Sequence, residues 1–236
     1  MPQTKSKKIL LYFFLFLLIG TINNKNLNNL ELTKIENVTV SGLDDKNNYE
    51  LINDLDFLKI ESLFFLDKKK IIQTINSNNL IEKYSVFKKY PSEIEIKVDQ
   101  TYFLAQLIKG NENFLFGSNG KFIKTASSKS NIPFIFGNFD KENFFKLKKA
   151  IDETDFSYEE IKNLFFFPSG RWDIETNSGL LIKLPRNNFK KSLDLLVGFL
   201  NSTREEEINK IDLRQLNQII TNGWWIRFSK LFIFKP

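Results

Sequence analysis

The 236-residue chain carries 34 Lys and Arg against 28 Asp and Glu, a net charge of +6, and it contains neither Cys nor His. The lack of these two residue types excludes disulfides, thiolate and imidazole metal ligands, cysteine nucleophiles and Ser-His-Asp triads. The lysines are scattered beside apolar residues, which indicates a solvated surface. We therefore expect no nucleic acid, no small-molecule substrate and no cofactor.

The first element is an apolar run at residues 9–22, which follows Lys5, Lys7 and Lys8. As a helix it spans roughly 21 Å, less than the roughly 30 Å hydrocarbon core of a bilayer, and this length alone favours a cleaved signal peptide. However, no small-residue cleavage signal follows Gly20, and the lysines can snorkel. We predict a single-pass transmembrane anchor that leaves residues 1–8 in the cytoplasm and the bulk outside, and cleavage remains the alternative.

The region up to residue 100 predicts the element order β-α-α-β-β. Residues 23–34 are Asn-rich and form a predicted linker, and the stretches 36–42, 81–89 and 92–98 read as strands. Helical turns are expected over 49–55, and Asp67 is placed to cap a helix over 68–77. Because residues 92–98 alternate strictly between apolar and polar, we expect a sheet with both helices on one face.

From residue 101 onward the pattern changes to mostly strands. Hairpins are predicted around 117–120, 177–179 and 222–223, and helices around 144–151, 157–160 and 189–200. The fold class is therefore α+β: an N-terminal transmembrane helix, a βααββ domain, then a mostly antiparallel β domain with flanking helices. The expected parts are a cytoplasmic tail (1–8), an anchor (9–22), a linker (23–34) and two domains (35–100 and 101–236).

Six stretches, in this order behind the anchor, carry a family resemblance. VTVSG (38–42) and YSVFKKYPSEIEIKV (84–98) resemble a POTRA domain. FLFGSNGKFI (114–123), NIPFIFG (131–137), RWDIETNSGLLIKLP (171–185) and KIDLR (210–214) are similar to the second domain of the bacterial cell division family FtsQ/DivIB. One departure is Gln215, where the family typically has Tyr after Asp-Leu-Arg.

The resemblance implies a bacterial inner-membrane protein of single-pass type II topology, with its bulk in the periplasm and its place at the division septum. It implies no enzymatic activity and a scaffold role in the divisome. The scaffold bridges FtsB- and FtsL-like partners, contacts other division proteins through the POTRA domain, and helps recruit and activate septal peptidoglycan synthesis.

A scaffold of this kind needs an accessible edge, and residues 210–220 are the predicted edge strand. The predicted partner-binding residues are Arg171, Asp212, Leu213, Arg214, Gln215, Asn217, Ile219 and Trp224. The planar fork of Arg suits partner carboxylates. For Arg214 the alternative is an intramolecular pair with Asp212 or a neighbouring strand. For Trp172 it is ordinary core packing, and for Trp224 and Trp225 it is core or membrane-interface packing.

The sequence argues against two alternative functions. A POTRA-containing outer-membrane assembly or secretion factor needs a long C-terminal barrel, which about 135 residues with helical signals do not supply. A periplasmic cell-wall hydrolase would need a carboxylate pair. The candidate acidic clusters, at 152–155, 159–160 and 205–207, lie in polar stretches that are typical of solvated surface.

Overall fold

The computed structural model describes residues 3–22, 34–202, 208–215, 217–222 and 224–227. The chain divides into two compact units, residues 1–100 and 101–236. Each unit has its own cluster of buried apolar side chains, so each is described by itself below. The predicted linker apart from Lys34, the acidic cluster at 205–207 and residues 228–236 lie outside the described residues.

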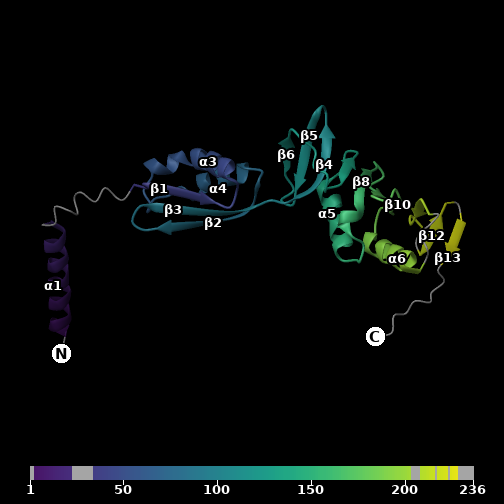
Figure 1. The fold of residues 1–236 in the computed structure, drawn as a ribbon. Helices are drawn as coiled ribbons and strands as arrows, with labels where there is room; N and C mark the ends of the chain where they lie inside the picture. The colour runs from purple at the N-terminus through teal and green to yellow at the C-terminus, as the bar shows by residue number, and fades with distance from the viewer. Residues whose placement is uncertain (1–2, 23–33, 203–207, 216, 223, 228–236) are drawn as a thin grey trace. The chain divides into compact units, whose positions relative to one another are not determined.

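The chain begins with helix α1, Gln3–Ile22 (Figure 1). Its large apolar side chains from Ile9 to Ile19 are all between 42% and 75% exposed, so they do not form one buried stripe. Such a helix lacks the amphipathic pattern of helices that pack on a globular core. Among the described residues, no helix combines the length and the apolar character needed to cross a bilayer.

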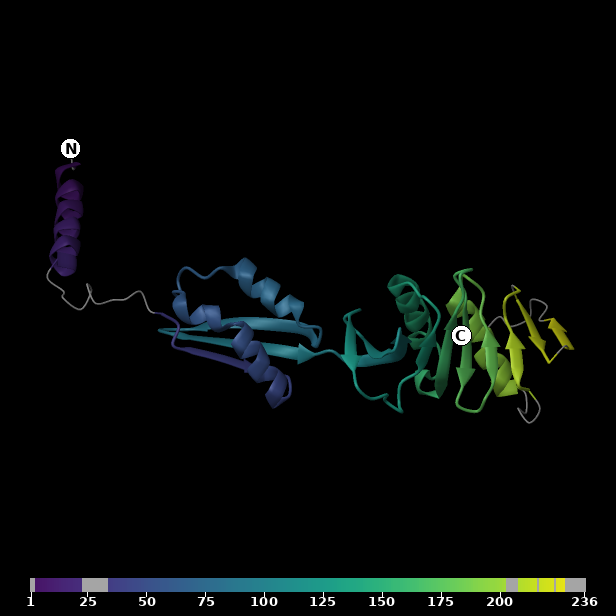
Figure 2. The same ribbon diagram turned by 90° about the horizontal axis from the view of Figure 1, so that it is seen from above.

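The rest of unit 1 is a three-stranded sheet with its helices on one face (Figures 1 and 2). Its elements are β1 (Asn37–Ser41), α3 (Asp45–Asp54), the 3₁₀ helix η1 (Asp56–Ile60), α4 (Lys68–Ser77), β2 (Ile81–Lys89) and β3 (Glu93–Gln100). β3 is central, parallel to β1 and antiparallel to β2. The predicted β-α-α-β-β order is confirmed.

Local sequence accounts for this unit. Ile94, Ile96 and Val98 are buried, while the residues between them are less buried or exposed, so one face of β3 packs on the helices. Asp67 caps α4, because its carboxylate accepts hydrogen bonds from the backbone N–H groups of Lys69 and Lys70 at 3.0 and 3.2 Å.

Unit 2 is a ten-stranded mixed sheet with the order β13-β12-β11-β10-β9-β8-β7-β4-β5-β6. Its strands are β4 (Phe103–Lys109), β5 (Glu112–Gly117), β6 (Phe122–Thr125), β7 (Phe134–Phe136), β8 (Ile161–Phe166), β9 (Trp172–Thr176), β10 (Leu181–Lys183), β11 (Lys210–Asp212), β12 (Gln218–Thr221) and β13 (Trp224–Arg227). Most neighbours are antiparallel, but β4–β7, β7–β8 and β10–β11 are parallel. The three predicted hairpins correspond to β5–β6, β9–β10 and β12–β13.

Helices α5 (Lys141–Asp152) and α6 (Phe189–Ser202) contribute to the same core as the inner face of the sheet. Trp172 is fully buried in this core among Phe139, Phe144 and Phe166, with ring centroids 4.8 to 6.1 Å away. The core alternative considered for Trp172 is therefore confirmed.

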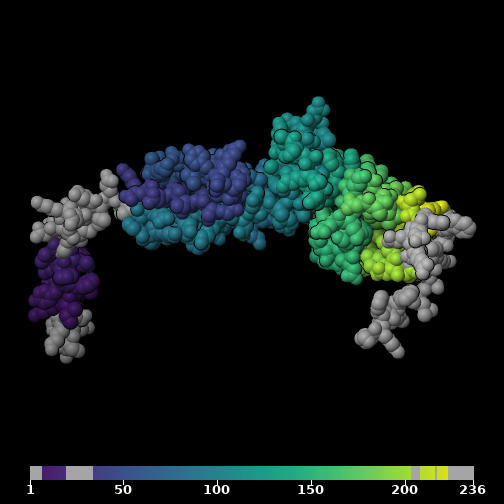
Figure 3. Space-filling model, viewed as in Figure 1, coloured from purple at the N-terminus to yellow at the C-terminus, as the bar shows by residue number. Residues whose placement is uncertain are grey.

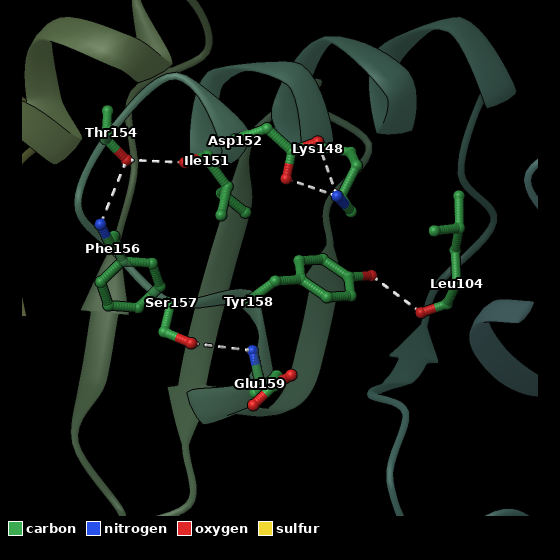
Figure 4. A network of polar contacts seen from close by, with 9 residues as sticks. All are labelled: Leu104, Lys148, Ile151, Asp152, Thr154, Phe156, Ser157, Tyr158 and Glu159. Carbon is green, nitrogen blue, oxygen red and sulfur yellow. Dashed lines mark hydrogen bonds and ion pairs between the residues drawn. The ribbon is translucent and has the colours of Figure 1, made fainter.

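A polar network joins the short 3₁₀ helix η2 (Tyr158–Glu160) to α5 and β4 (Figure 4). The Tyr158 hydroxyl donates to the Leu104 carbonyl at 2.9 Å, and the Lys148 ammonium lies 4.7 Å above the Tyr158 ring while it pairs with Asp152. Burial raises the pKa of Tyr158, so the phenol remains a hydrogen-bond donor at physiological pH.

Candidate partner-binding site

The last described strands of the chain form one end of the unit 2 sheet (Figure 1), and the segment that contains β11 and β12 reaches the surface of that unit (Figure 3). β12 pairs with β11 on one side and with β13 on the other. The prediction that residues 210–220 form the edge is therefore wrong, because the turn at Asn222 returns the chain as a further strand. Among the described residues, β13 is the terminal strand of the sheet at this end.

A row of charged residues crosses the neighbouring strands. Lys183 of β10 is opposite Asp173 of β9 and opposite Asp212 of β11. Residues next to this row, such as Ile182 and Ile211, belong to the core, so the charged row faces the other side of the sheet. We call Arg171, Asp173, Lys183, Asp212 and Arg214 the charge row. The register thus alternates negative, positive and negative side chains over three strands.

Asp212 holds Arg214 through several hydrogen bonds. The Arg214 Nε–H donates to both Asp212 carboxylate oxygens at 2.9 Å, and Nη2 donates to Oδ2 at 2.5 Å. The structure therefore contains the intramolecular pair between Arg214 and Asp212 that the sequence offered as the alternative to a partner contact. Burial alone would raise the pKa of Asp212, but the hydrogen bonds and charge of Arg214 hold this pKa below its usual value. The Arg214 side chain remains 44% exposed.

Arg171 and Asp173 form a looser pair. Their Nε and Oδ1 atoms are 3.5 Å apart, and neither atom has a hydrogen-bond partner among the described residues. The Arg171 guanidinium carbon lies 4.2 Å from the centre of the Phe167 ring. Burial raises the pKa of Asp173, and this effect exceeds the opposing influence of Arg171, Lys183 and Arg214. The ion pair is therefore incompletely formed.

A groove of about 230 Å³ opens beside Arg214. Leu213, Arg214, Gln215 and Asn217 line one side of it. The other side is lined by α6 and the segment before it, where Lys191 and Asp194 face the groove with Leu195. The lining thus combines apolar side chains with charged and amide groups, which suits a segment that mixes apolar and acidic side chains.

The predicted partner-binding residues divide into two groups. Leu213 and Ile219 are 2% and 0% exposed and belong to the core, so they offer a partner almost no side-chain surface, although Leu213 borders the groove. Sequence reasoning assigned them to the surface because it took the whole segment as an exposed edge. Gln215 and Asn217 are exposed, and Asn217 has a φ of 58°. Trp224 occupies the first position of β13 and pairs with Thr221, while its side chain lies outside what the structure describes.

Sequence reasoning missed Asp173 and Lys183 as members of this site. Asp173 stands between the core residues Trp172 and Ile174, in WDIET, and Lys183 follows the core residue Ile182, in LLIK. A charged residue on a strand that is otherwise core-forming was the available signal. This signal alone could not place the two residues in the site, because the sequence does not give the pairing register of β9, β10 and β11.

The acidic clusters named in the sequence lie at the surface or outside the part of the chain that the structure describes. Among the described residues, no group of three or more such side chains could hold a metal ion. Asp152 is paired with Lys148, and Glu159 and Glu160 lie exposed in η2. The third acidic cluster, at 205–207, lies outside the described range.

We expect the two acids of the charge row to respond oppositely to pH. The Asp212 pKa is lowered on folding, so its ionised form stabilises the fold above the ordinary value of 3.8, and this stabilisation is lost as the pH falls through the folded-state pKa. Asp212→Asn should therefore lower the free energy of unfolding by about 1–2 kcal/mol at neutral pH, and by less near pH 3.

The Asp173 pKa is raised on folding, so its contribution to stability is greatest below 3.8 and is lost as the pH rises through the folded-state pKa. Asp173→Asn is the matched variant, and at neutral pH it should leave the free energy of unfolding unchanged or raise it. Urea unfolding at several pH values, followed by tryptophan fluorescence, measures both variants. Equal losses with the same pH profile would contradict this assignment.

Comparison with known proteins gives consistent matches. A family model for the FtsQ-type POTRA domain matches residues 33–99, and one for the C-terminal domain of cell division protein FtsQ/DivIB matches residues 105–214. The cell division protein FtsQ of Rickettsia bellii (strain RML369-C) is 25% identical over 188 residues, which cover 78% of this chain and 70% of that protein. FtsQ of Rhizobium meliloti (strain 1021) is 22% identical over 184 residues, covering 76% and 60%.

Among solved structures, the major extracytoplasmic domain of the cell division protein DivIB from Geobacillus stearothermophilus (trans isomer) matches 45% of this chain and 98% of that chain. The sequence identity is 14% and the TM-score is 0.34.

Proposed function

Because the chain belongs to the FtsQ/DivIB family of cell division proteins, we propose that it is a non-catalytic scaffold that bridges FtsB- and FtsL-like partners. In this role it helps to recruit and activate septal peptidoglycan synthesis, and its POTRA domain contacts other division proteins. The observation that carries the proposal is the order of the parts: an apolar helix, a POTRA domain, and the family's C-terminal domain.

The proposed topology is a single-pass type II protein of the bacterial inner membrane. Residues 1–8 remain in the cytoplasm, residues 9–22 form the anchor, and residues 23–34 link it to the periplasmic domains at 35–100 and 101–236. Supporting this, the apolar side chains of α1 are exposed on all sides, and lysines precede them. Snorkelling of those lysines and slight bilayer thinning compensate for the short apolar run.

The proposed partner site is the end of the sheet formed by β11, β12 and β13 together with the groove beside Arg214. A terminal strand offers backbone N–H and C=O groups to an added partner strand. Arg171 and Arg214 would receive acidic side chains of that partner, while Gln215 and Asn217 contact it from the lining of the groove. Asp212 has a supporting role, because it fixes the Arg214 fork. Leu213 and Ile219 support the site by packing beneath it.

Anchoring makes a weak contact sufficient. A partner confined to the same membrane experiences a high effective concentration at the scaffold. The interface can therefore rely on a short strand and a few charge-assisted hydrogen bonds.

We expect Arg214→Ala to weaken binding of the FtsB-like partner by about tenfold, which corresponds to about 1.4 kcal/mol. The loss is expected because the variant removes the exposed guanidinium from the groove. Binding of full-length protein in detergent to the purified partner, measured by biolayer interferometry, gives the dissociation constants.

Lys109→Ala is the matched control, since Lys109 is also an exposed basic residue but lies on β4, on the far side of β7, β8, β9 and β10 from the site. It should bind like wild type. Equal binding by both variants would show that the partner site lies elsewhere. If the wild-type chain captured neither an FtsB-like nor an FtsL-like protein, the scaffold proposal itself would fail.

A further inference from the structure

Four large apolar side chains are exposed at one end of the sheet of unit 1. Ile60, Phe64, Phe65 and Tyr90 are 81%, 55%, 75% and 65% exposed, and we call them the end patch. The Phe64 and Tyr90 rings touch, with centroids 5.7 Å apart. Single exposed apolar residues are ordinary on protein surfaces, but several large ones gathered at one end of a domain indicate an interaction surface.

The end patch is built from two segments that are distant in sequence. Ile60, Phe64 and Phe65 come from the end of η1 and the connection to α4, while Tyr90 lies in the turn between β2 and β3. The Lys88 ammonium donates a hydrogen bond to the Leu63 carbonyl at 2.6 Å and ties the two segments together. The fold therefore holds the two segments that carry these side chains side by side at this end of the sheet.

The chain from α1 reaches the three-stranded sheet of unit 1 at this same end. Lys34 forms a β-bridge with Ser62, the Ile35 N–H donates to the Glu61 carbonyl at 3.2 Å, and the Glu36 N–H donates to the Ser92 carbonyl at 2.8 Å. Residues 23–33 separate this point from the end of α1. A stretch of that length reaches at most about 40 Å even when fully extended. The end patch is thus on the part of the domain that is tethered to the anchor.

We propose that the end patch inserts into the interfacial layer of the lipid bilayer that holds α1, so that the POTRA domain docks on the membrane surface. This inference rests on the proposed membrane anchor. Aromatic side chains favour the boundary between headgroups and acyl chains, and burial of apolar area there drives interfacial binding. Lys59 and Lys89 flank the patch, but both pair with nearby acids, so apolar contact carries most of the interaction.

The occupant is lipid because the tether keeps this end of the domain within reach of the bilayer. The membrane is therefore the surface that the patch meets at the highest effective concentration. Docking would restrict the orientations of the POTRA domain relative to the membrane plane.

The test uses full-length protein in nanodiscs that contain phosphatidylethanolamine and phosphatidylglycerol. The chain has no Cys, so a single introduced thiol can be labelled with a fluorophore. Lys68→Cys places the label on an exposed position three residues after Phe65, and Lys46→Cys places it on α3 beyond the opposite end of β1. Lipids brominated near the headgroup quench fluorophores that lie close to the interface.

Quenching should be about threefold stronger at the Lys68→Cys label than at the Lys46→Cys label. The double substitution Phe65→Ser and Tyr90→Ser should reduce it to the level of Lys46→Cys. Tyr102→Ser is the matched control, since Tyr102 is also 65% exposed but follows the opposite end of β3. It should leave the quenching unchanged.

Equal quenching at the two label positions, or quenching that the double substitution does not change, would overturn the inference. Burial of the Lys68→Cys label only after a protein partner is added would also overturn it, because the patch would then be a protein-docking surface. A chain that fails to enter nanodiscs at all would instead refute the proposed anchor. Ile60→Ser provides a second variant, and circular dichroism checks that each variant is folded.

Discussion

Trp172→Ala is expected to destabilise unit 2 by about 3–5 kcal/mol, the range for removing a large aromatic side chain from a core. Trp172 is fully buried, contacts three aromatic rings, and donates its indole N–H to the Asn143 side chain at 3.3 Å. The substitution would leave a cavity at the centre of the core and remove the donor to Asn143. Because a domain of this size has a total stability of about 5–15 kcal/mol, a large fraction would be lost.

Hydrogen exchange measured by mass spectrometry reports each unit separately, so it can locate the effect. Peptides from residues 101–202 should exchange faster in Trp172→Ala, while peptides from 34–100 remain protected. Trp172→Phe keeps one ring and should cost only about 1–2 kcal/mol. Tyr102→Ala at an exposed position should cost within about 0.5 kcal/mol. A loss below about 1 kcal/mol for Trp172→Ala would contradict the central position of this side chain.

Gly42→Ala is expected to destabilise unit 1 by about 3 kcal/mol or more. Gly42 follows β1 with a φ of +116°, and a Cβ at this position would lie 1.7 Å from the Val98 carbonyl oxygen. The backbone conformation is unfavourable for any residue with a side chain, and the contact also forces β1 and β3 apart. Since β1 and β3 are paired strands, the damage should spread through the sheet.

Gly110→Ala separates the two causes of this loss. Gly110 also has a positive φ, +64°, but a Cβ there would meet nothing within 4 Å. It should cost only the backbone term of about 1–2 kcal/mol. Hydrogen exchange of residues 34–100 for Gly42→Ala, and of residues 101–125 for Gly110→Ala, gives the comparison. Equal losses would mean that the close approach to Val98 relaxes without penalty.

Individual strands, helix starts and hairpins could be predicted from the sequence. Alternation at Ile94, Ile96 and Val98 predicted the central strand of unit 1, and Asp67 predicted the start of α4. The turn residues around 117–120 and 177–179 predicted two hairpins that the structure contains. These features depend on neighbours within a few residues, because periodicity and turn conformation are local properties of the chain.

The residues of the candidate site could be predicted only in part, because the charges that face one another depend on the pairing register of β9, β10 and β11. Arg171, Asp212 and Arg214 could be selected from the sequence through the family resemblance, and the pairing of Arg214 with Asp212 could be anticipated because the two residues are close in the chain. Asp173 and Lys183 could not be selected from the sequence. Lys183 lies opposite both Asp173 and Asp212 only because β10 pairs with β9 on one side and with β11 on the other.

The sequence by itself determined the element order of unit 1, the cap at Asp67, the hairpins and the family to which the chain belongs, because these follow from local patterns and motif order. Only the tertiary structure decided that β13 follows β12 at the end of the sheet, that Leu213 and Ile219 are core residues, and that β10 and β11 run parallel. Those features depend on which distant strands become neighbours. A one-residue change in pairing would exchange the buried and exposed faces of a strand without altering any local pattern.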